Sequence, residues 1–351
     1  MEQKSVLIGM SGGVDSSVAA ALLKEQGYHV IGATMRLWTY SDSCNMKHEG
    51  CCAESAVEDA RRVCDKLGID FYVMNFKDMF KDKVVDYFVD EYIHGRTPNP
   101  CIACNKYLKF DALLKKALAM GIDYVATGHY AKIEKGEDGK YILRASEAVK
   151  KDQSYVLYNF TQEQLAHTLM PLGGYNKDWV RQKAEELGLG VAHKPDSQEI
   201  CFVEDDDYAK FITDYSGYKP KEGDILDVNG NVIGKHRGLI YYTIGQRKGI
   251  GAYGRPMFVM KIDAENNTIT LGEKGMEFSN ELTAYDVNFV SGEFPKENML
   301  ITAKVRYQAP PAAAMLCPQK DGTVKLMFPE PQRAVTPGQA VVFYDGDIVL
   351  G

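Results

Sequence analysis

Long apolar runs are missing from this sequence. No uninterrupted stretch approaches the roughly 20 residues that a membrane-spanning helix needs. The N-terminus, MEQKSVLIGMSGG, also lacks the extended apolar segment and small-residue cleavage site of a secretory signal. We therefore predict a cytoplasmic protein, or an organellar one whose targeting segment has been removed, with no membrane as a partner.

A surplus of positive charge is missing too. Lys and Arg number 41 against 48 Asp and Glu, which gives a formal net charge of −7. This balance argues against a protein that binds nucleic acid through an overall positive charge. It does not exclude a local basic patch, because phosphate binding depends on where the charges lie. Residues that can line one phosphate-binding groove are Lys106, Lys109, Lys150, Lys151, Lys235, His236, Arg237, Arg247, Lys248 and Arg306, whereas Lys115 and Lys116 fit a solvated helix face.

The 351 residues show no repeat or low-complexity tract, and their composition, 45% hydrophobic and 25% charged, is that of a packed protein. In the first half, apolar runs alternate with segments of helical periodicity. Predicted strands are 5–10, 29–37, 70–76 and 123–129, and predicted helices are 14–27, 54–68, 78–95 and 105–121. This alternation predicts an α/β, doubly wound parallel sheet that binds ligands at the carboxyl ends of its strands.

After about residue 205 the pattern changes to short strands separated by Gly and Asn turns. The strongest turn signal is VNGN (228–231), because Asn-Gly suits a type I′ hairpin turn. We expect a domain over 1–205, a small β-rich central domain over 206–272 and a C-terminal β-barrel over 273–351.

A phosphate-binding loop is the strongest single motif. Ser11-Gly12-Gly13-Val14-Asp15-Ser16-Ser17 stands directly between the first strand and the first helix. The two glycines allow an anion to approach the backbone, and the helix start offers unpaired N–H groups. The serine hydroxyls are additional donors, and Asp15 is placed to hold Mg²⁺ or to cap the helix.

No Walker sequence is present, and SGGVDSS instead resembles the PP-loop of the ATP pyrophosphatases. Members of that superfamily split ATP between its α and β phosphates and transfer AMP to a carbonyl oxygen. Met35, at the end of the second strand, is placed to meet the adenine, and a side chain at Gly128 would obstruct the nucleotide. The predicted ATP site comprises Gly9, Met10, Ser11, Gly12, Gly13, Val14, Asp15, Ser16, Met35 and Gly128.

Eight cysteines in a chain of this kind indicate thiols, metal ligands or redox groups rather than structural disulfides. Pro98 and Pro100 stiffen the segment before Cys104, so we expect this thiol on a rigid loop at a helix start, where its pKa falls. Cys201 follows in a second loop, PDSQEICF. Cys44, His48, Cys51 and Cys52 fit incidental cysteines in a mobile loop better than a metal site.

Six motifs in one order, SGGVDSS, GRTPNPCIACNKYLKF, ATGHYA, KKDQSYVLY, PDSQEICFV and GQRKGIG, resemble the tRNA-specific 2-thiouridylase (MnmA/TrmU) family across nearly the whole chain. The resemblance implies a PP-loop domain, a small central domain and a C-terminal barrel. It also implies ATP-dependent 2-thiolation of the wobble uridine of tRNA, with ATP and Mg²⁺ as cofactors.

In the chemistry that this resemblance implies, the C2 oxygen of uridine is adenylated and sulfur then replaces it. Cys201 would carry a persulfide received from a sulfur-carrier protein or cysteine desulfurase. Cys104 would be the nucleophile, and a Cys104–Cys201 disulfide would close the cycle. Residues that match tRNA or target-base contacts of the family are Asn99, Pro100, Cys101, His129, Lys151, Asp152, Gln153, Arg306, Tyr307 and Gln339.

Cys101 departs from the family pattern, because many members carry Asp there. The three thiols Cys101, Cys104 and Cys201 open an alternative, a [4Fe–4S] cluster with one free iron that binds sulfide. A zinc site is a third alternative for the same cysteines, with only three ligands apparent in the sequence. Two functions other than tRNA thiolation remain as alternatives: a PP-loop ligase for a small molecule, and a non-catalytic metal or sulfur carrier. All versions of the thiolation require the ATP loop and the thiols to converge.

Overall fold

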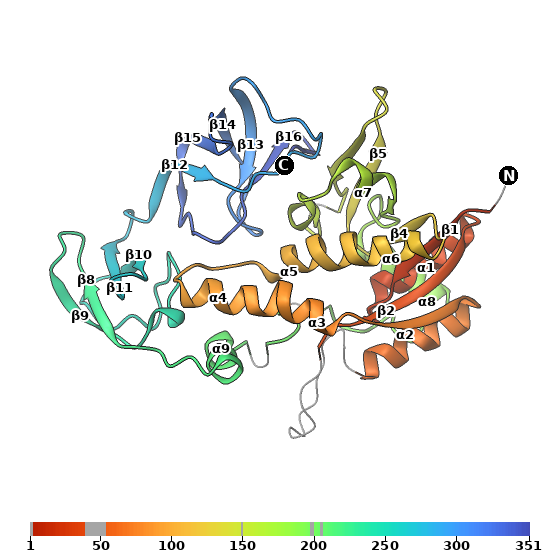
Figure 1. Cartoon of the computed structure of the whole chain (residues 1–351), viewed down its shortest axis with the longest axis horizontal. Helices are drawn as coiled ribbons and strands as arrows, with labels where there is room; N and C mark the ends of the chain where they lie inside the picture. Colours follow the sequence, from red (N-terminus) through yellow and green to blue (C-terminus); the bar gives the residue numbers. More distant parts are fainter. Residues whose placement is uncertain (1–2, 39–53, 149, 197–199, 204–205) are drawn as a thin grey trace.

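The computed structural model describes residues 3–38, 54–148, 150–196, 200–203 and 206–351. Its strands form a five-stranded, a four-stranded and an eight-stranded sheet. In Figure 1 the first sheet lies toward the N-terminus, the four-stranded sheet lies at the opposite end of the molecule, and the strands of the eight-stranded sheet lie above helices α4 to α6. No helix among the described residues is long and apolar enough to cross a membrane.

The first sheet is entirely parallel, in the order β3-β2-β1-β4-β7. Its strands are β1 Ser5–Gly9, β2 His29–Arg36, β3 Asp70–Asn75, β4 Tyr124–Ala126 and β7 Thr168–Leu169. The first four confirm the strands predicted from apolar runs. The two-residue β7 was not predicted, because two residues carry no periodicity.

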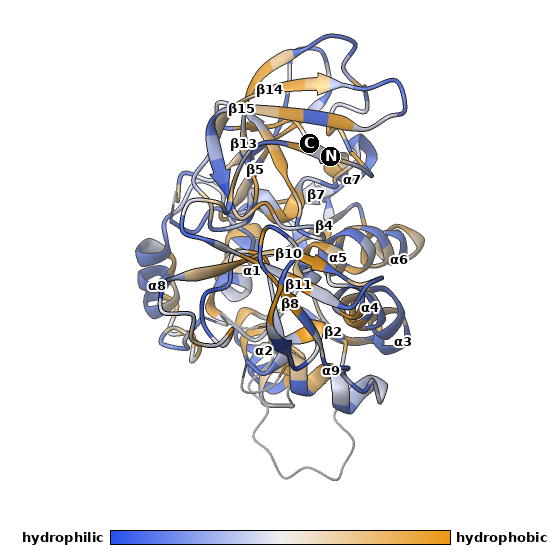
Figure 2. Ribbon diagram, turned by 90° about the vertical axis from the view of Figure 1, so that its left-hand side faces the viewer, coloured by the Kyte–Doolittle hydropathy of each residue, from blue (hydrophilic) through white to orange (hydrophobic). Residues whose placement is uncertain are grey.

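Helices cover both faces of this sheet, as predicted. Val6 and Ile8 of β1 are buried with α1, α2 and α8, whereas Leu7 between them is buried with the opposite helical layer. The first layer contains α1 Val14–Glu25, α2 Glu54–Leu67 and α8 Lys177–Glu186, and the second contains α3 Lys77–Phe80, η1 Lys81–Asp86, α4 Tyr87–Ile93, α5 Pro100–Ala103, η2 Cys104–Ala112 and α6 Leu113–Ala119. Figure 2 shows hydrophobic colour along strands and hydrophilic colour on outer helices such as α8 and α3.

The helix predicted over 105–121 begins earlier, at Pro100, and runs through α5, η2 and α6. Asn99 caps it, since its Oδ1 accepts the N–H of Cys101 at 3.1 Å. Proline suits the first helical position because the N–H that it lacks would have no helical partner. The expectation that Cys104 lies on a loop at the helix start is therefore wrong. Cys101 lies in the first turn of the helix, and Cys104 lies at the end of that first turn.

The four-stranded sheet has the order β10-β11-β8-β9. Its strands are β8 Gly223–Leu226, β9 Val232–His236, β10 Met257–Asp263 and β11 Thr268–Glu273. The predicted hairpin joins β8 to β9, but its type I′ turn is wrong, since Gly230 has a positive φ of 85° and Asn229 does not. Instead, Oδ1 of Asp227 accepts the N–H groups of Asn229 and Asn231, both at 2.8 Å, and this local bonding shapes the turn.

The eight-stranded sheet has the order β12-β15-β14-β13-β16-β17-β6-β5. Its C-terminal strands are β12 Phe278–Ala284, β13 Met299–Lys304, β14 Ala312–Pro318, β15 Val324–Arg333, β16 Val342–Asp345 and β17 Ile348–Val349. The hairpin of β5 Ala131–Lys135 and β6 Tyr141–Ala145 comes from the first half of the chain and was not predicted. It pairs with β17, where the N–H of Ala145 donates to the carbonyl of Asp347 at 2.7 Å, so the first and last parts of the chain share a sheet.

The remaining helices are short. They are η3 Ser154–Leu157, α7 Gln162–Ala166, α9 Tyr208–Ser216 and η4 Leu239–Tyr241.

Candidate active site

The glycine-serine loop forms the N-terminal entry to α1. Gly13 is the N-cap residue and no side chain caps the helix, so the first-turn N–H groups are available to an anion. The hydroxyls of Ser16 and Ser17 donate to the carbonyl of Gly13 at 3.2 and 2.8 Å, and the N–H of Ser11 donates to Oγ of Ser16 at 3.2 Å. These serines shape the loop from within, and Ser11 alone of the three is exposed.

Two glycines permit close approach of backbone to backbone here. Gly12 has a φ of 70°, and a Cβ on it would lie 2.2 Å from the carbonyl oxygen of Ala56. A Cβ on Gly128 would lie 2.7 Å from the backbone C of Asp15 and N of Ser16. Position 128, two residues after β4, therefore requires glycine for a reason that was not predicted: a side chain there would strike the loop itself.

Asp15 does not cap the helix but reaches across to two other elements. Nζ of Lys177, at the start of α8, donates to both carboxylate oxygens at 2.8 Å, and the hydroxyl of Tyr130 donates to Oδ1 at 2.7 Å. Burial and the charge of Asp15 raise the pKa of Tyr130, so its hydroxyl keeps its proton. Lys177 and Tyr130 thus hold the Asp15 carboxylate in place beside the loop.

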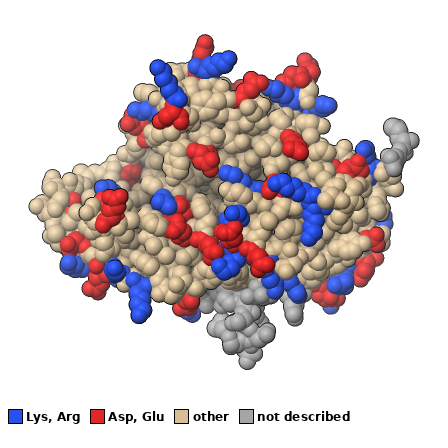
Figure 3. Space-filling model, in the orientation of Figure 1, with Lys and Arg blue, Asp and Glu red and all other residues tan. Residues whose placement is uncertain are grey.

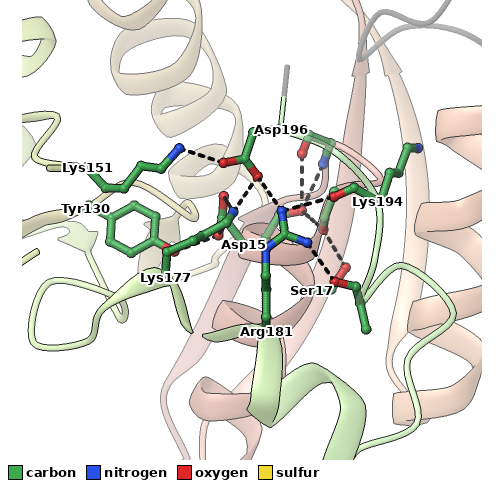
Figure 4. A network of polar contacts seen from close by, with 12 residues as sticks. Asp15, Ser17, Tyr130, Lys151, Lys177, Arg181, Lys194 and Asp196 are labelled. Carbon is green, nitrogen blue, oxygen red and sulfur yellow. Dashed lines mark hydrogen bonds and ion pairs between the residues drawn. The ribbon is translucent and has the colours of Figure 1, made fainter. Parts of the chain in front are cut away.

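Asp196, which precedes Cys201 by five residues in the sequence, extends this network (Figure 4). Its carboxylate lies 2.7 Å from Nζ of Lys151, 2.7 Å from Nζ of Lys177 and 3.3 Å from a guanidinium nitrogen of Arg181. Partial burial raises the pKa of the Asp196 carboxyl, but hydrogen bonds from the two lysines outweigh it and hold that pKa below its usual value.

A fourth cation touches the loop directly. Nζ of Lys194 donates to the carbonyl of Gly12 at 3.1 Å and to Oδ2 of Asp59 at 2.8 Å. Lys177 and Arg181 of α8 therefore lie around the loop together with Lys151 and Lys194 from two other segments of the chain (Figure 4). Four cations beside unpaired helix N–H groups suit a polyphosphate.

Most of this network was not predicted from the sequence, namely Tyr130, Lys177, Arg181 and Lys194. A partial signal existed, because Lys177 and Arg181 are four residues apart and share one helix face. No signal indicated that this face would meet the loop. Met35 lies in β2 beside Met74 of β3, and Gly128 follows β4, as expected for positions near the carboxyl ends of the strands.

The three candidate cysteines differ in their surroundings. Cys104 is buried at 8% exposure and Cys201 is half-buried, and both contact the same hydrophobic cluster. They are present as thiols rather than as a disulfide. Cys101 is exposed, but the enclosing protein desolvates its thiol and raises its pKa above the ordinary 9.0, while the charge of Lys109 lowers it in part.

These thiols do not form a ready metal site. Within the described ranges, which include Cys101, Cys104 and Cys201, no group of three or more Cys, His, Asp or Glu is placed to hold a metal ion. The arrangement does not fit the [4Fe–4S] or zinc alternative. The other cysteine-rich segment, with Cys44, His48, Cys51 and Cys52, lies outside the described residues.

Several predicted tRNA contacts are engaged within the protein. His129 is 9% exposed, Oγ1 of Thr127 lies 2.7 Å from its Nδ1, and burial holds its pKa well below 6.5. Gln153 bonds the backbone of Tyr130 through its own N–H and its Oε1, at 2.9 and 3.0 Å. Asp152 accepts the N–H groups of Ser146 and Ser154. In this structure His129 is a neutral buried side chain.

Gln339, one of the C-terminal residues predicted to contact tRNA, meets the segment just before Asn99, Pro100 and Cys101. Nε2 of Gln339 donates to the carbonyl of Thr97 at 2.7 Å. The hydroxyl of Tyr307, beside the half-buried Arg306, donates to the carbonyl of Asp152 at 3.2 Å. Burial first, then the charges of Asp152 and Cys101, raise the pKa of Tyr307.

Some of the basic residues are paired with carboxylates nearby. Lys106 pairs with Asp286 at 3.4 Å, Lys115 with Asp111 at 2.7 Å and Lys235 with Asp224 at 2.5 Å. Figure 3 shows basic and acidic side chains interspersed over one face, without a single basic patch.

The glycine-serine loop follows the first strand of a parallel sheet, precedes a helix that no side chain caps, and has cations around it. These features define the class of the protein: a nucleotide-binding α/β protein of the PP-loop type. Comparisons with known proteins agree with this class. Three family models match in succession: a tRNA methyl transferase HUP domain over residues 4–205, a tRNA methyl transferase PRC-barrel domain over 209–273 and an aminomethyltransferase beta-barrel domain over 279–351.

Curated relatives identify the family more narrowly. The chain is 59% identical to the tRNA-specific 2-thiouridylase MnmA of Acetivibrio thermocellus, over 100% of this chain and 99% of that protein. It is 58% identical to the protein of the same name from Clostridioides difficile, over 99% and 97%. The chain therefore belongs to the MnmA family of tRNA-specific 2-thiouridylases. Among solved structures, a 4-thiouridine synthetase–RNA complex with bound ATP aligns over 57% of this chain and 45% of that chain, at 18% identity and a TM-score of only 0.36.

Proposed function

We propose that this protein uses ATP to replace the C2 oxygen of the wobble uridine of tRNA with sulfur. The observation that carries the proposal is the match over the full chain to 2-thiouridylases at up to 59% identity. The loop of residues 11–17, with its available N–H groups and surrounding cations, supports the use of a nucleotide.

In the activation step, the first-turn N–H groups of α1 bind the phosphates of ATP and orient the α-phosphate toward the uridine C2 oxygen. Lys177, Arg181 and Lys194 balance the charge of the departing pyrophosphate. Asp15 is a suitable Mg²⁺ ligand, since that ion needs only one or two carboxylates besides phosphate oxygens and water. When bound, Mg²⁺ would neutralise phosphate charge.

In the sulfur step, Cys201 holds a persulfide that a sulfur-carrier protein or cysteine desulfurase has delivered. The terminal sulfur passes to C2 as AMP leaves with the former C2 oxygen, and Cys104 is the nucleophile that completes the transfer by forming a disulfide with Cys201. A reducing thiol must then restore both cysteines. The partial burial of both thiols protects these intermediates from water.

Asn99, Pro100 and Cys101 hold the target base in this proposal, with Tyr307 and Gln339 close by on the C-terminal side. Unpaired bases are well suited to stack on aromatic side chains. Lys151, Asp152, Gln153 and Arg306 contribute the flanking tRNA contacts, and His129 contributes after a local rearrangement that exposes its ring.

The test is mass analysis of nucleosides from unmodified tRNA incubated with the protein, ATP, a reducing thiol and a persulfide donor, namely a cysteine desulfurase supplied with cysteine. We expect 2-thiouridine at the wobble position only when ATP is present. Cys104→Ser and Cys201→Ser should abolish the product while ATP binding stays intact. Thiolation at the normal rate by Cys104→Ser would refute the role of that residue, and absence of 2-thiouridine from every tRNA would refute the function.

A further inference from the structure

Tyr130 is a buried side chain that joins the nucleotide loop to a segment from another part of the chain. It lies directly before β5 and is 2% exposed. Its hydroxyl donates to Oδ1 of Asp15 at 2.7 Å (Figure 4). Gln153 holds both of its backbone groups: the N–H of Tyr130 donates to Oε1 of Gln153 at 3.0 Å, and its carbonyl accepts the N–H of Gln153 at 2.9 Å. A displacement of Gln153 therefore moves the residue that holds Asp15.

The segment around Gln153 is stiffened by hydrogen bonds to Asp152. Oδ1 of Asp152 accepts the N–H groups of Ser146 and Ser154 at 2.9 and 3.2 Å, and its Oδ2 accepts the hydroxyl of Ser154 at 2.8 Å. Both serines are buried, at 6% and 0% exposure. Because a satisfied buried network is rigid, the segment moves as a unit rather than deforming. The carbonyl of Asp152 also accepts the hydroxyl of Tyr307, which lies between β13 and β14, at 3.2 Å.

The carboxylate of Asp15 has little acceptor capacity left. Its Oδ1 accepts both the hydroxyl of Tyr130 and Nζ of Lys177, and its Oδ2 accepts the same ammonium group. A carboxylate has about four acceptor sites, so these bonds leave about one for a cation such as Mg²⁺. Tyr130, Lys177 and a metal ion therefore compete for Asp15, and the position of Tyr130 affects how well Asp15 binds the metal.

Lys151 indicates the direction of the effect. Its Nζ lies 2.7 Å from Oδ2 of Asp196, and Nζ of Lys177 lies 2.7 Å from Oδ1 of the same carboxylate. The Lys151 side chain is 42% exposed, so a phosphate can reach it and draw it away from Asp196. Asp196 then attracts Lys177 more strongly, and Lys177 releases Asp15. Withdrawal of Lys177 and displacement of Tyr130 both free Asp15 for a metal ion that accompanies ATP.

We propose that Tyr130 is a positioning residue that couples the binding of tRNA to the binding of ATP. Occupation of Lys151 and Gln153 by tRNA frees Asp15, and the protein then binds ATP and its metal ion more tightly. The proposal rests on the proposed function, which places tRNA at Lys151 and Gln153. In this role Tyr130 acts through Asp15 and need touch neither substrate. Since binding free energies are linked, ATP tightens the binding of tRNA by the same factor.

The experiment measures the affinity of the full chain for α,β-methylene ATP with Mg²⁺, by isothermal titration, with and without a saturating anticodon stem-loop RNA. The readout is the ratio of the two affinities. In the original protein the RNA should tighten nucleotide binding about 5- to 150-fold, the usual range of such coupling. Tyr130→Phe keeps the ring and the backbone bonds to Gln153 but loses the hydroxyl, so the ratio should fall at least about threefold.

Tyr215→Phe is the matched control. The hydroxyl of Tyr215 also donates to an aspartate, Oδ1 of Asp86 at 2.6 Å, but in the helical layer on the other face of the sheet from α1. Its ratio should equal that of the original protein. A merely structural role of Tyr130 would lower the melting temperature and weaken both nucleotide affinities equally, which leaves the ratio unchanged. Gln153→Ala interrupts the same path at its other end and should also lower the ratio, so it provides the test if Tyr130→Phe does not fold.

A ratio within about twofold of one in the original protein would overturn the inference. An equal ratio in the original protein, Tyr130→Phe and Gln153→Ala would overturn it as well. Neither result would change the outcome of the nucleoside analysis, which tests thiolation by itself. Failure of the original protein to bind any stem-loop or ATP would instead refute the proposed function, and this inference with it.

Discussion

Nζ of Lys177 lies 2.8 Å from both carboxylate oxygens of Asp15 and 2.7 Å from Oδ1 of Asp196. One ammonium group thus joins the nucleotide loop to the segment that leads to Cys201. At 12% exposure this lysine side chain is largely withdrawn from water, so screening by solvent is limited.

Lys177→Met should weaken ATP binding about 10- to 100-fold. It removes a charge-assisted contact worth about 1.5–3 kcal/mol and leaves the negative charge of Asp15 facing the phosphates. Isothermal titration with a non-hydrolysable ATP analogue measures the loss. Lys183→Met is the matched control on the same helix, since Lys183 pairs with Glu25 at 2.9 Å, outside the network around the loop. Equal affinities in the two variants would contradict the role of Lys177.

Gly128→Ala should disrupt the loop. Its Cβ would lie 2.7 Å from backbone atoms of Asp15 and Ser16, and backbone cannot rotate away as a side chain can. We expect ATP binding to fall by at least about tenfold, with a loss of stability of about 1–3 kcal/mol from overpacking. Gly174→Ala is the control, because its Cβ would meet nothing within 4 Å. An unchanged ATP affinity in Gly128→Ala would show that the loop adapts.

Burial of His129 should make the protein less stable at mildly acidic pH. Burial and then the charge of Lys109 hold the pKa of the folded-state His129 well below 6.5. Below about pH 6.5 the unfolded chain therefore binds a proton that the folded chain does not, and stability falls by up to about 1.4 kcal/mol per pH unit until the folded pKa is reached.

Urea unfolding at pH 7.5 and 5.5 measures this effect. His129→Gln should unfold with a smaller difference between the two pH values, because glutamine does not titrate. The same pH dependence in both proteins would assign the effect to another group.

Cys101 should react slowly at neutral pH despite its exposure. Desolvation raises its thiol pKa above 9.0, and the thiolate is the reactive form. The alkylation rate should therefore still be rising above pH 9. Lys109→Gln removes the charge that lowers this pKa and should shift the profile to still higher pH.

Iodoacetamide labelling followed by peptide mass analysis gives the profile, with the half-buried Cys317 as an internal reference for the reagent. A Cys101 profile that levels off below pH 8 would contradict the raised pKa.

Periodicity predicted the first sheet well because each of its main strands is a continuous apolar run between helices. β7 and the β5–β6 hairpin were not predicted from the sequence, for different reasons. β7 is too short to carry a pattern, and β5–β6 is stabilised by pairing with β17, about 200 residues later in the chain. Pairing with β17 across such a distance leaves no local signal, but Asp138-Gly139 between β5 and β6 is a hairpin signal that periodicity alone did not reveal.

For the segment of Cys104 and for the nucleotide loop, too, part of the prediction was correct and part was wrong. Pro98 and Pro100 do stiffen the chain before Cys104, but Pro100 opens the helix rather than preceding it, so Cys104 lies one turn inside. The nucleotide loop was predicted correctly in place, while the direction of the Asp15 side chain was not.

The sequence by itself determined the glycine-serine loop, the strand before it, the alternation that makes a parallel sheet and the motifs that identify the family, since each depends on neighbouring residues. Only the tertiary structure decided that Lys177, Arg181, Lys194 and Tyr130 meet around that loop, and that Gln339 meets the segment just before Cys101. Those contacts arise from the packing of elements that are far apart in the chain. Local residue patterns do not indicate which surfaces of such elements will pack against one another.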